Sequence, residues 1–212
     1  MPRRLLREER GFTLTEMLVT MVLMLTVMYA LYSIFDMSIR VFAFGNHKVE
    51  ATENARLGLD KMARELRGAY PADPVHGKTN LFWNAGAPGT ALAAPPLATG
   101  PITFGNDRNG NHRIYDPGPP AVLDPGEQIT YSLSGSTLQR NGDPVAEYVK
   151  DVDGDGQALT FTYLDENGTT VTGTPSAIRT VRIKLEVKVN RGGGGDAKQT
   201  LQTDVTLRNR SG

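Results

Sequence analysis

An unbroken apolar run near the N-terminus constrains this 212-residue chain more than any other feature. From Phe12 to Phe35 the only charged side chain is Glu16. With a helical rise of ~1.5 Å per residue the run is about 36 Å long, and the hydrocarbon core of a bilayer is about 30 Å thick. The run exceeds the roughly 7–15 apolar residues of a secretory signal peptide, and no good small-residue cleavage site follows it. The sequence therefore predicts a transmembrane helix.

Charges before the run predict its orientation. Residues 1–11 carry four arginines and two glutamates. An excess of basic residues favours the cytoplasmic side of a membrane. We therefore expect a single-pass protein of the cytoplasmic membrane. Residues 1–11 would be a cytoplasmic leader, residues 12–36 would cross the bilayer, and the C-terminal domain would be extracytoplasmic.

The helical pattern continues beyond the membrane segment. Residues 37–70 contain no proline, and Leu59, Met62 and Leu66 repeat at helical spacing with charged residues between them. The two prolines of "YPADP" at 70–74 end the pattern. We expect one helix from about residue 12 to 69, first buried in the membrane and then amphipathic.

The rest of the chain has the signals of a β domain. Residues 71–125 are rich in loop-forming glycine and proline, with a short strand predicted at 101–104. Within residues 126–212, segments 128–133, 158–163, 181–189 and 201–207 alternate apolar and polar residues, and Asn141-Gly142 predicts a type I′ hairpin. In segment 181–189 the exposed face would carry Arg182, Lys184, Glu186 and Lys188. The predicted class is α+β, with the apolar stripe of residues 55–70 covering an antiparallel sheet.

Composition argues against several classes of function. The chain has no net formal charge, so nothing indicates nucleic-acid binding, and it has no cysteine for disulfides or thiolate chemistry. Its three histidines fall in no metal-spaced or triad-like motif, and "RGGGGD" lacks the Lys-Ser/Thr and the following helix of a phosphate-binding loop. We predict no catalytic residues and no enzymatic activity.

The N-terminal stretch "GFTLTEMLVTMVLML" resembles the class III signal sequence of type IV pilins and type II secretion pseudopilins. The family pattern is matched by Gly11, Phe12 and Glu16. The resemblance implies that prepilin peptidase cuts between Gly11 and Phe12, that the new Phe12 amine is N-methylated, and that the helix later enters a filament core. Later segments, from "EQITYSLSGSTLQRNG" to "IRTVRIKLEV", are similar to W-type minor pilins and J-type minor pseudopilins. Such subunits commonly prime assembly.

An acid inside a membrane span requires a reason, because an unpaired carboxylate in hydrocarbon is costly. Cleavage would create a cation at the amino group of Phe12. Phe12 lies four residues before Glu16, about one helical turn, so the amine and the carboxylate of one chain could meet. The family resemblance favours pairing of Glu16 with the Phe12 amine of a neighbouring subunit. The remaining alternative is a solvated Glu16 at headgroup depth.

Two loops have the composition of a calcium site. Asp151, Asp153 and Asp155 stand at positions one, three and five of "DVDGDG", with a glycine at position six. The twelfth position is a threonine, so Asp165 or Glu166 would have to supply the closing ligand. "DRNGNHRIYD" offers Asp107, Asn109, Asn111 and Asp116, but its glycine is at position four. Either loop could instead be a polar turn without an ion. No other cofactor is predicted.

Two classes of protein remain open from the sequence. The first is a minor pilin or pseudopilin of a type IV pilus, a type II secretion system or a DNA-uptake apparatus. Its partners would be other such subunits, prepilin peptidase, the inner-membrane assembly platform and membrane lipid. The second is a single-pass membrane protein with an extracytoplasmic sensor or ligand-binding domain. An N-terminus at Phe12 would favour the first class, and an intact leader the second.

Overall fold

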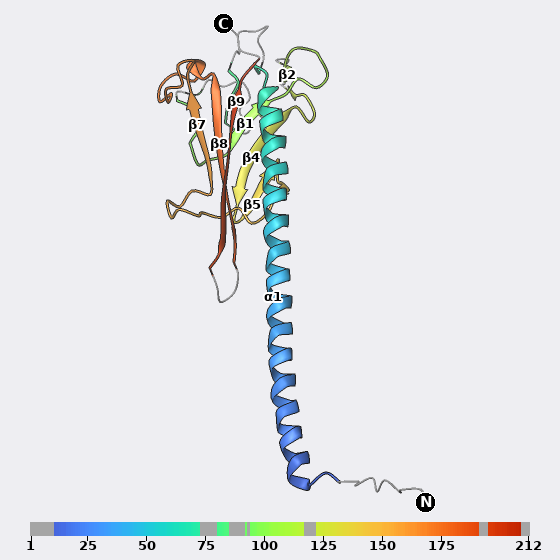
Figure 1. Cartoon of the computed structure of the whole chain (residues 1–212). Coiled ribbons are helices and arrows are strands. Elements are labelled where there is room, and N and C mark those ends of the chain that lie inside the picture. The colour runs from blue at the N-terminus through green and yellow to red at the C-terminus, as the bar shows by residue number, and fades with distance from the viewer. Residues whose placement is uncertain are drawn as a thin grey trace, which may run out of the picture. The chain divides into compact units, whose positions relative to one another are not determined.

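The structure is a computed structural model that describes residues 11–72, 80–84, 92, 94–116, 122–190 and 195–208. The chain forms two compact units, Met1–Asn46 and His47–Gly212. The expected leader, residues 1–11, lies outside the described residues except for Gly11. Helix α1 (Leu14–Arg67) contributes residues to both units, and all strands belong to the second (Figure 1).

The N-terminal part of α1 is apolar on every side. Its most hydrophobic 18-residue window has a mean hydropathy of 2.1 and is 0% buried, so the helix is long and apolar enough to cross a membrane. Leu18, Leu25 and Tyr32, spaced by seven, are all more than half exposed, as are most of the large apolar residues between them. A helix that is hydrophobic all round requires an apolar environment. The helix predicted from about 12 to 69 is thus confirmed within two residues at each end.

The C-terminal part of α1 buries one face. The buried positions are mostly small or aliphatic, and they are Ala51, Ala55, Gly58, Leu59, Met62, Ala63 and Leu66. Small residues let the sheet approach closely, since the Cα of Gly58 lies opposite Ala146 and Leu138. Nearer the N-terminus of this part, Thr52 donates a hydrogen bond to Gln199 Oε1 of β9 at 3.0 Å. The expected cover of the sheet by this stripe is therefore confirmed.

Two antiparallel sheets and one short ribbon make up the β part. One sheet has the order β1-β4-β5-β6 and the other β7-β8-β9, while β2 and β3 form the ribbon (Figure 1). The strands are β1 (Ile102–Gly105), β2 (Tyr115–Asp116), β3 (Val122–Leu123), β4 (Gln128–Ser134), β5 (Thr137–Arg140), β6 (Asp143–Ala146), β7 (Leu159–Leu164), β8 (Thr180–Val189) and β9 (Ala197–Thr206). A 3-10 helix, Pro175–Ala177, precedes β8.

The turn chemistry read from the sequence is confirmed. Asn141 and Gly142 join β5 to β6 with φ values of 53° and 91°, the two left-handed residues of a type I′ turn. Trp83 is 2% exposed and donates from Nε1 to Gln128 Oε1 at 3.2 Å, which ties its loop to the start of β4.

One exposed position was predicted wrongly. Along β8 the apolar residues Val181, Ile183 and Leu185 are fully buried, as the alternation predicts, but Glu186 on the opposite face is only 1% exposed. Residues 148–158 run beside this part of β8, where Lys150 N donates to Glu186 O and Glu186 N donates to Ala158 O, and Val152 N of this segment donates to the Glu186 side chain at Oε2. The class is nevertheless the expected one, an α+β fold of one long N-terminal helix followed by antiparallel sheets.

Candidate functional site

The start of α1 is closed by a reciprocal hydrogen-bond pair between Thr13 and Glu16. Glu16 Oε2 accepts from Thr13 N at 2.9 Å and from Thr13 Oγ1 at 2.8 Å, and Glu16 N lies 3.3 Å from Thr13 Oγ1. This is a capping box, in which a threonine at the N-cap and a glutamate three residues later satisfy otherwise unpaired N–H groups. The T-x-x-E spacing at 13–16 was a sequence signal for it.

The capping box uses only part of the carboxylate. Both contacts to Thr13 fall on Oε2, and Glu16 Oε1 has no hydrogen bond within the described part of the chain. Gly11 has no atom within 4 Å of the position where a Cβ would stand, and Phe12 is 81% exposed. Gly11 and Phe12, which flank the predicted cut, are therefore accessible within the described part of the chain, and Glu16 keeps an oxygen for a second partner.

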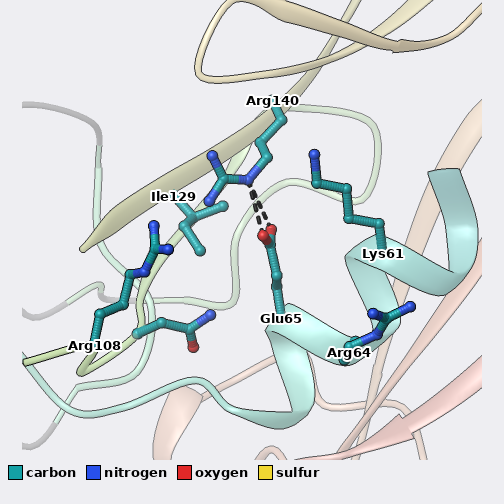
Figure 2. Close-up of a pocket in the computed structure, with 7 residues that line it drawn as sticks. Lys61, Arg64, Glu65, Arg108, Ile129 and Arg140 are labelled. Carbon is teal, nitrogen blue, oxygen red and sulfur yellow. Dashed lines mark hydrogen bonds and ion pairs between the residues drawn. The ribbon is translucent and has the colours of Figure 1, made fainter. Parts of the chain in front are cut away.

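A polar cavity of about 490 Å³ lies where the C-terminal part of α1 meets the first sheet (Figure 2). It is lined by Lys61, Arg64, Glu65, Asn106, Arg108, Ile129 and Arg140. Inside it, Glu65 accepts from Arg140 Nε through both oxygens at 3.0 and 2.9 Å. Glu65 also accepts from Tyr131 Oη at 2.7 Å. These bonds join the helix to β4 and β5.

The Glu65 carboxylate and its surroundings raise the pKa values of the two side chains that bond to it. Burial, and then the hydrogen bond to Glu65, raises the pKa of the Tyr131 phenol. The hydrogen bond to Glu65 likewise raises the pKa of the Arg140 guanidinium. Both groups therefore keep their protons over the ordinary pH range. The bonds of Glu65 to Arg140 and Tyr131 are those of a structural ion pair, and none of the described residues that line the cavity is a nucleophile with a base beside it.

The three predicted ligands of the first loop converge. Asp151, Asp153 and Asp155 each offer a carboxylate oxygen, and these atoms lie within 4.8 Å of one another. Asp153 Oδ2 also accepts from Lys184 Nζ at 2.8 Å. This hydrogen bond lowers the pKa of Asp153 to about 2. Asp165 caps its own turn instead, by accepting from the N–H groups of two later residues.

The second loop has a partner that sequence reasoning missed. Asn109 Nδ2 and Asn111 Nδ2 both donate to Asp124 Oδ2, at 3.1 and 2.6 Å. Asp116, which had been grouped with them, lies in β2 and pairs with Val122 of β3. No spacing rule points to Asp124, because the fold brings it back from beyond the β2–β3 ribbon.

Comparison with known proteins matches the N-terminus. Residues 6–32 match the family model described as the prokaryotic N-terminal methylation motif. Searches of curated proteins and of solved structures returned no significant match. The matched range includes Gly11, Phe12, Thr13 and Glu16 and most of the apolar run from Phe12 to Phe35. This motif implies processing by prepilin peptidase and assembly with other pilin subunits, and it points to a structural subunit. The methylation motif and the long apolar helix that carries it are consistent with a type IV pilin-like protein.

Proposed function

We propose that this protein is a minor pilin or pseudopilin, a structural subunit that primes assembly of a type IV pilus or of a type II secretion pseudopilus. The observation that carries the proposal is the position of Glu16, the only acid of the apolar run, five residues after the Gly11 cleavage position. A membrane anchor alone has no need of an acid there.

Processing would occur on the cytoplasmic side of the membrane. The basic leader favours that side, and the cut between Gly11 and Phe12 would leave an amine, to be N-methylated, at the head of the helix. The domain beyond the membrane would be extracytoplasmic, and the helix would stay in the membrane until the assembly platform extracts the subunit. The apolar surface of residues 14–35 would pass from lipid to the helices of neighbouring subunits.

Glu16 would set the register of each new subunit. Its Oε2 is engaged by Thr13, whereas Oε1 faces no donor among the described residues. A carboxylate surrounded by hydrocarbon is stabilised by a cation, and the Phe12 amine of a neighbour is the cation that the family motif supplies. The capping box holds Glu16 at the helix start, where that amine would arrive.

Three variants of position 16 and one of position 11 test this proposal. Gly11→Ala should leave the leader uncut, as read by mass spectrometry of the N-terminus in a host with the peptidase. Glu16→Ala removes both cap and charge, whereas Glu16→Gln removes the charge but keeps a residue that completes a capping box. Both should be processed normally and fail to enter filaments, while Glu16→Asp should be partly incorporated.

Each alternative gives a different result. Normal filament entry of Glu16→Gln, with failure of Glu16→Ala, would reduce Glu16 to a helix cap and reject the pairing. An intact leader on the unaltered chain in a peptidase-competent host would favour the membrane-bound sensor. A priming role predicts that deletion of the gene lowers the number of filaments, with the protein itself far less abundant than the major subunit.

A further inference from the structure

The loops 107–113 and 151–157 are built on one hydrogen-bond plan. In each, the first aspartate accepts from the N–H groups of positions four and six: Asp107 from Gly110 and His112, and Asp151 from Gly154 and Gly156. The side chains at positions three and five each accept from the N–H two residues later. In the 151–157 loop the carboxylate oxygens of positions one, three and five lie within 4.8 Å of one another, and the 107–113 loop repeats the hydrogen bonds that hold these side chains.

The 107–113 loop, which is the poorer match to the calcium motif, has the same left-handed backbone conformation at positions four and six as the 151–157 loop. Gly154 and Gly156 have φ values of 88° and 79°, and Gly110 and His112 have values of 77° and 62°. His112 thus adopts the left-handed conformation that the motif usually assigns to a glycine at position six. The missing glycine, which weakened the match of "DRNGNH" to a calcium loop, does not change the shape of the loop.

A buried glutamate lies against each loop. Among the described residues, Glu127 and Glu186 are the only charged side chains that are fully buried, at 2% and 1% exposure. Glu127 Oε1 accepts from the N–H groups of Arg108 and Asn109 at 2.9 and 3.0 Å. Glu186 Oε2 accepts from Val152 N at 2.7 Å. Both glutamates come from strands or turns far away in the sequence, so no spacing within the loops reveals them.

The two glutamates differ in what balances their charge. Lys184 Nζ lies 2.7 Å from Glu186 Oε1 and 2.8 Å from Asp153 Oδ2, so an ammonium group already serves the 151–157 loop. Glu127 Oε2 is buried and has no hydrogen-bond partner within the described part of the chain. A buried carboxylate without a cation is strongly disfavoured. For Asp107, Asp124 and Glu127 the one ion pair seen in the described part of the chain is that of Asp107 with the exposed imidazole of His112, at 3.7 Å.

We propose that the 107–113 loop binds a calcium ion. The side-chain oxygens of Asp107, Asn109 and Asn111 would hold it, and Asp124 and Glu127 would supply the carboxylates that a standard loop takes from its twelfth position. Asp124 lies against the loop, because the side-chain amide nitrogens of Asn109 and Asn111 both donate to its Oδ2. An oxygen that accepts one N–H retains a lone pair for the metal.

The chemistry of the ligands selects the ion. Carboxylate and amide oxygens suit hard cations, and three carboxylates with two amides favour the irregular coordination by six to eight oxygens that Ca²⁺ accepts. Mg²⁺ requires near-octahedral geometry and keeps its water, so it should compete poorly. The ion would join the end of β1 to the start of β4, where Gly105 pairs with Gln128. We expect a Kd of about 10⁻⁴–10⁻³ M, as in extracellular calcium modules.

Calorimetry and thermal unfolding of the full-length chain in detergent, stripped of metal, test the site. Titration with CaCl₂ should give one binding event and raise the Tm, and MgCl₂ at the same concentration should do so far less. Glu127→Gln should abolish the calcium response while leaving the Tm of the calcium-free protein unchanged or higher, because it removes an unpaired buried charge. Asn109→Asp should tighten binding, a gain that misfolding cannot mimic.

The 151–157 loop supplies the matched control. Asp153→Asn should leave the calcium response unchanged if the ion binds at the 107–113 loop. Loss of the response in Asp153→Asn, together with its survival in Glu127→Gln, would overturn the proposal and place the ion at the other loop. The absence of heat and of a Tm shift at about 10 mM calcium would overturn it altogether. Processing and filament entry are measured separately, so neither result bears on the proposed role in assembly.

Discussion

The two parts of α1 are made from the same kind of backbone but meet different surroundings. Residues 14–46 are exposed or at most half-buried and mostly apolar, whereas residues 47–67 bury a stripe of small and aliphatic side chains beneath the sheets. The first part therefore depends on lipid or on other subunits, and the second is stabilised by its own chain. Both parts are helical, but most helical stability in proteins comes from the packed face. The difference between the two parts therefore lies in what each one packs against.

The largest expected contrast is between two leucines. Leu66 is fully buried beneath the sheets, so Leu66→Ala should cost about 2–5 kcal/mol of unfolding free energy. Leu23 is 58% exposed, and Leu23→Ala should leave that free energy nearly unchanged while weakening contacts with other subunits. The fluorescence of Trp83, the one tryptophan, would report unfolding in detergent. Equal losses of unfolding free energy in the two variants would mean that the two parts of the helix unfold in one cooperative step.

Two carboxylates sharpen the same contrast. Glu65 joins the helix to Tyr131 and Arg140, so Glu65→Gln should cost about 1–3 kcal/mol, since it weakens charged hydrogen bonds in a partly buried site. Asp60 is exposed in the same part of the helix, and Asp60→Asn should change stability by less than about 0.5 kcal/mol. Chemical denaturation of the three proteins measures both values. An unchanged free energy of unfolding in Glu65→Gln would mean that the ion pair does not contribute to holding the helix on the sheet.

The Glu65 site also predicts a response to alkaline pH. Burial and the Glu65 carboxylate raise the pKa of Tyr131, so the folded state disfavours the phenolate. The stabilising effect is fully present below the unfolded pKa of about 10 and is lost as the pH rises above it, by up to about 1.4 kcal/mol per pH unit. Tyr131→Phe should flatten this loss only in part, because burial also raises the pKa of Tyr163. An unchanged slope in Tyr131→Phe would contradict the assignment.

Local patterns predicted the parts of this fold that depend on near neighbours. The helix, the Asn141-Gly142 turn and the alternation of β8 follow from backbone preferences and from periodicity. The motif at Gly11 and Glu16 is equally local, and it was found from the sequence. The capping box of Thr13 and Glu16 is equally local, since its T-x-x-E spacing lies within four residues.

What the sequence did not reveal depends on residues brought together by the fold. Glu186 follows the exposed spacing of its strand, but it is buried where segment 148–158 runs beside the strand and Val152 N donates to its carboxylate. Asp124 and Glu127 reach the 107–113 loop through β-strand pairing, and the left-handed φ of His112 replaces a glycine that the motif would require. No pattern within a short window contains these relations, since each joins groups more than ten residues apart or depends on the loop as a whole.

The smallest expected effect compares the two internal glycines of α1. A Cβ at Gly45 meets nothing within 4 Å, so Gly45→Ala should gain helix propensity of up to about 1 kcal/mol. A Cβ at Gly58 would stand 3.1 Å from the Ala146 Cβ, so in Gly58→Ala the same gain should be offset by displacement of the sheet. Hydrogen exchange of amides around each site measures both changes. Gly58→Ala as stabilising as Gly45→Ala would mean that the sheet yields freely, and close packing would then not be the reason for small residues in this part of the helix.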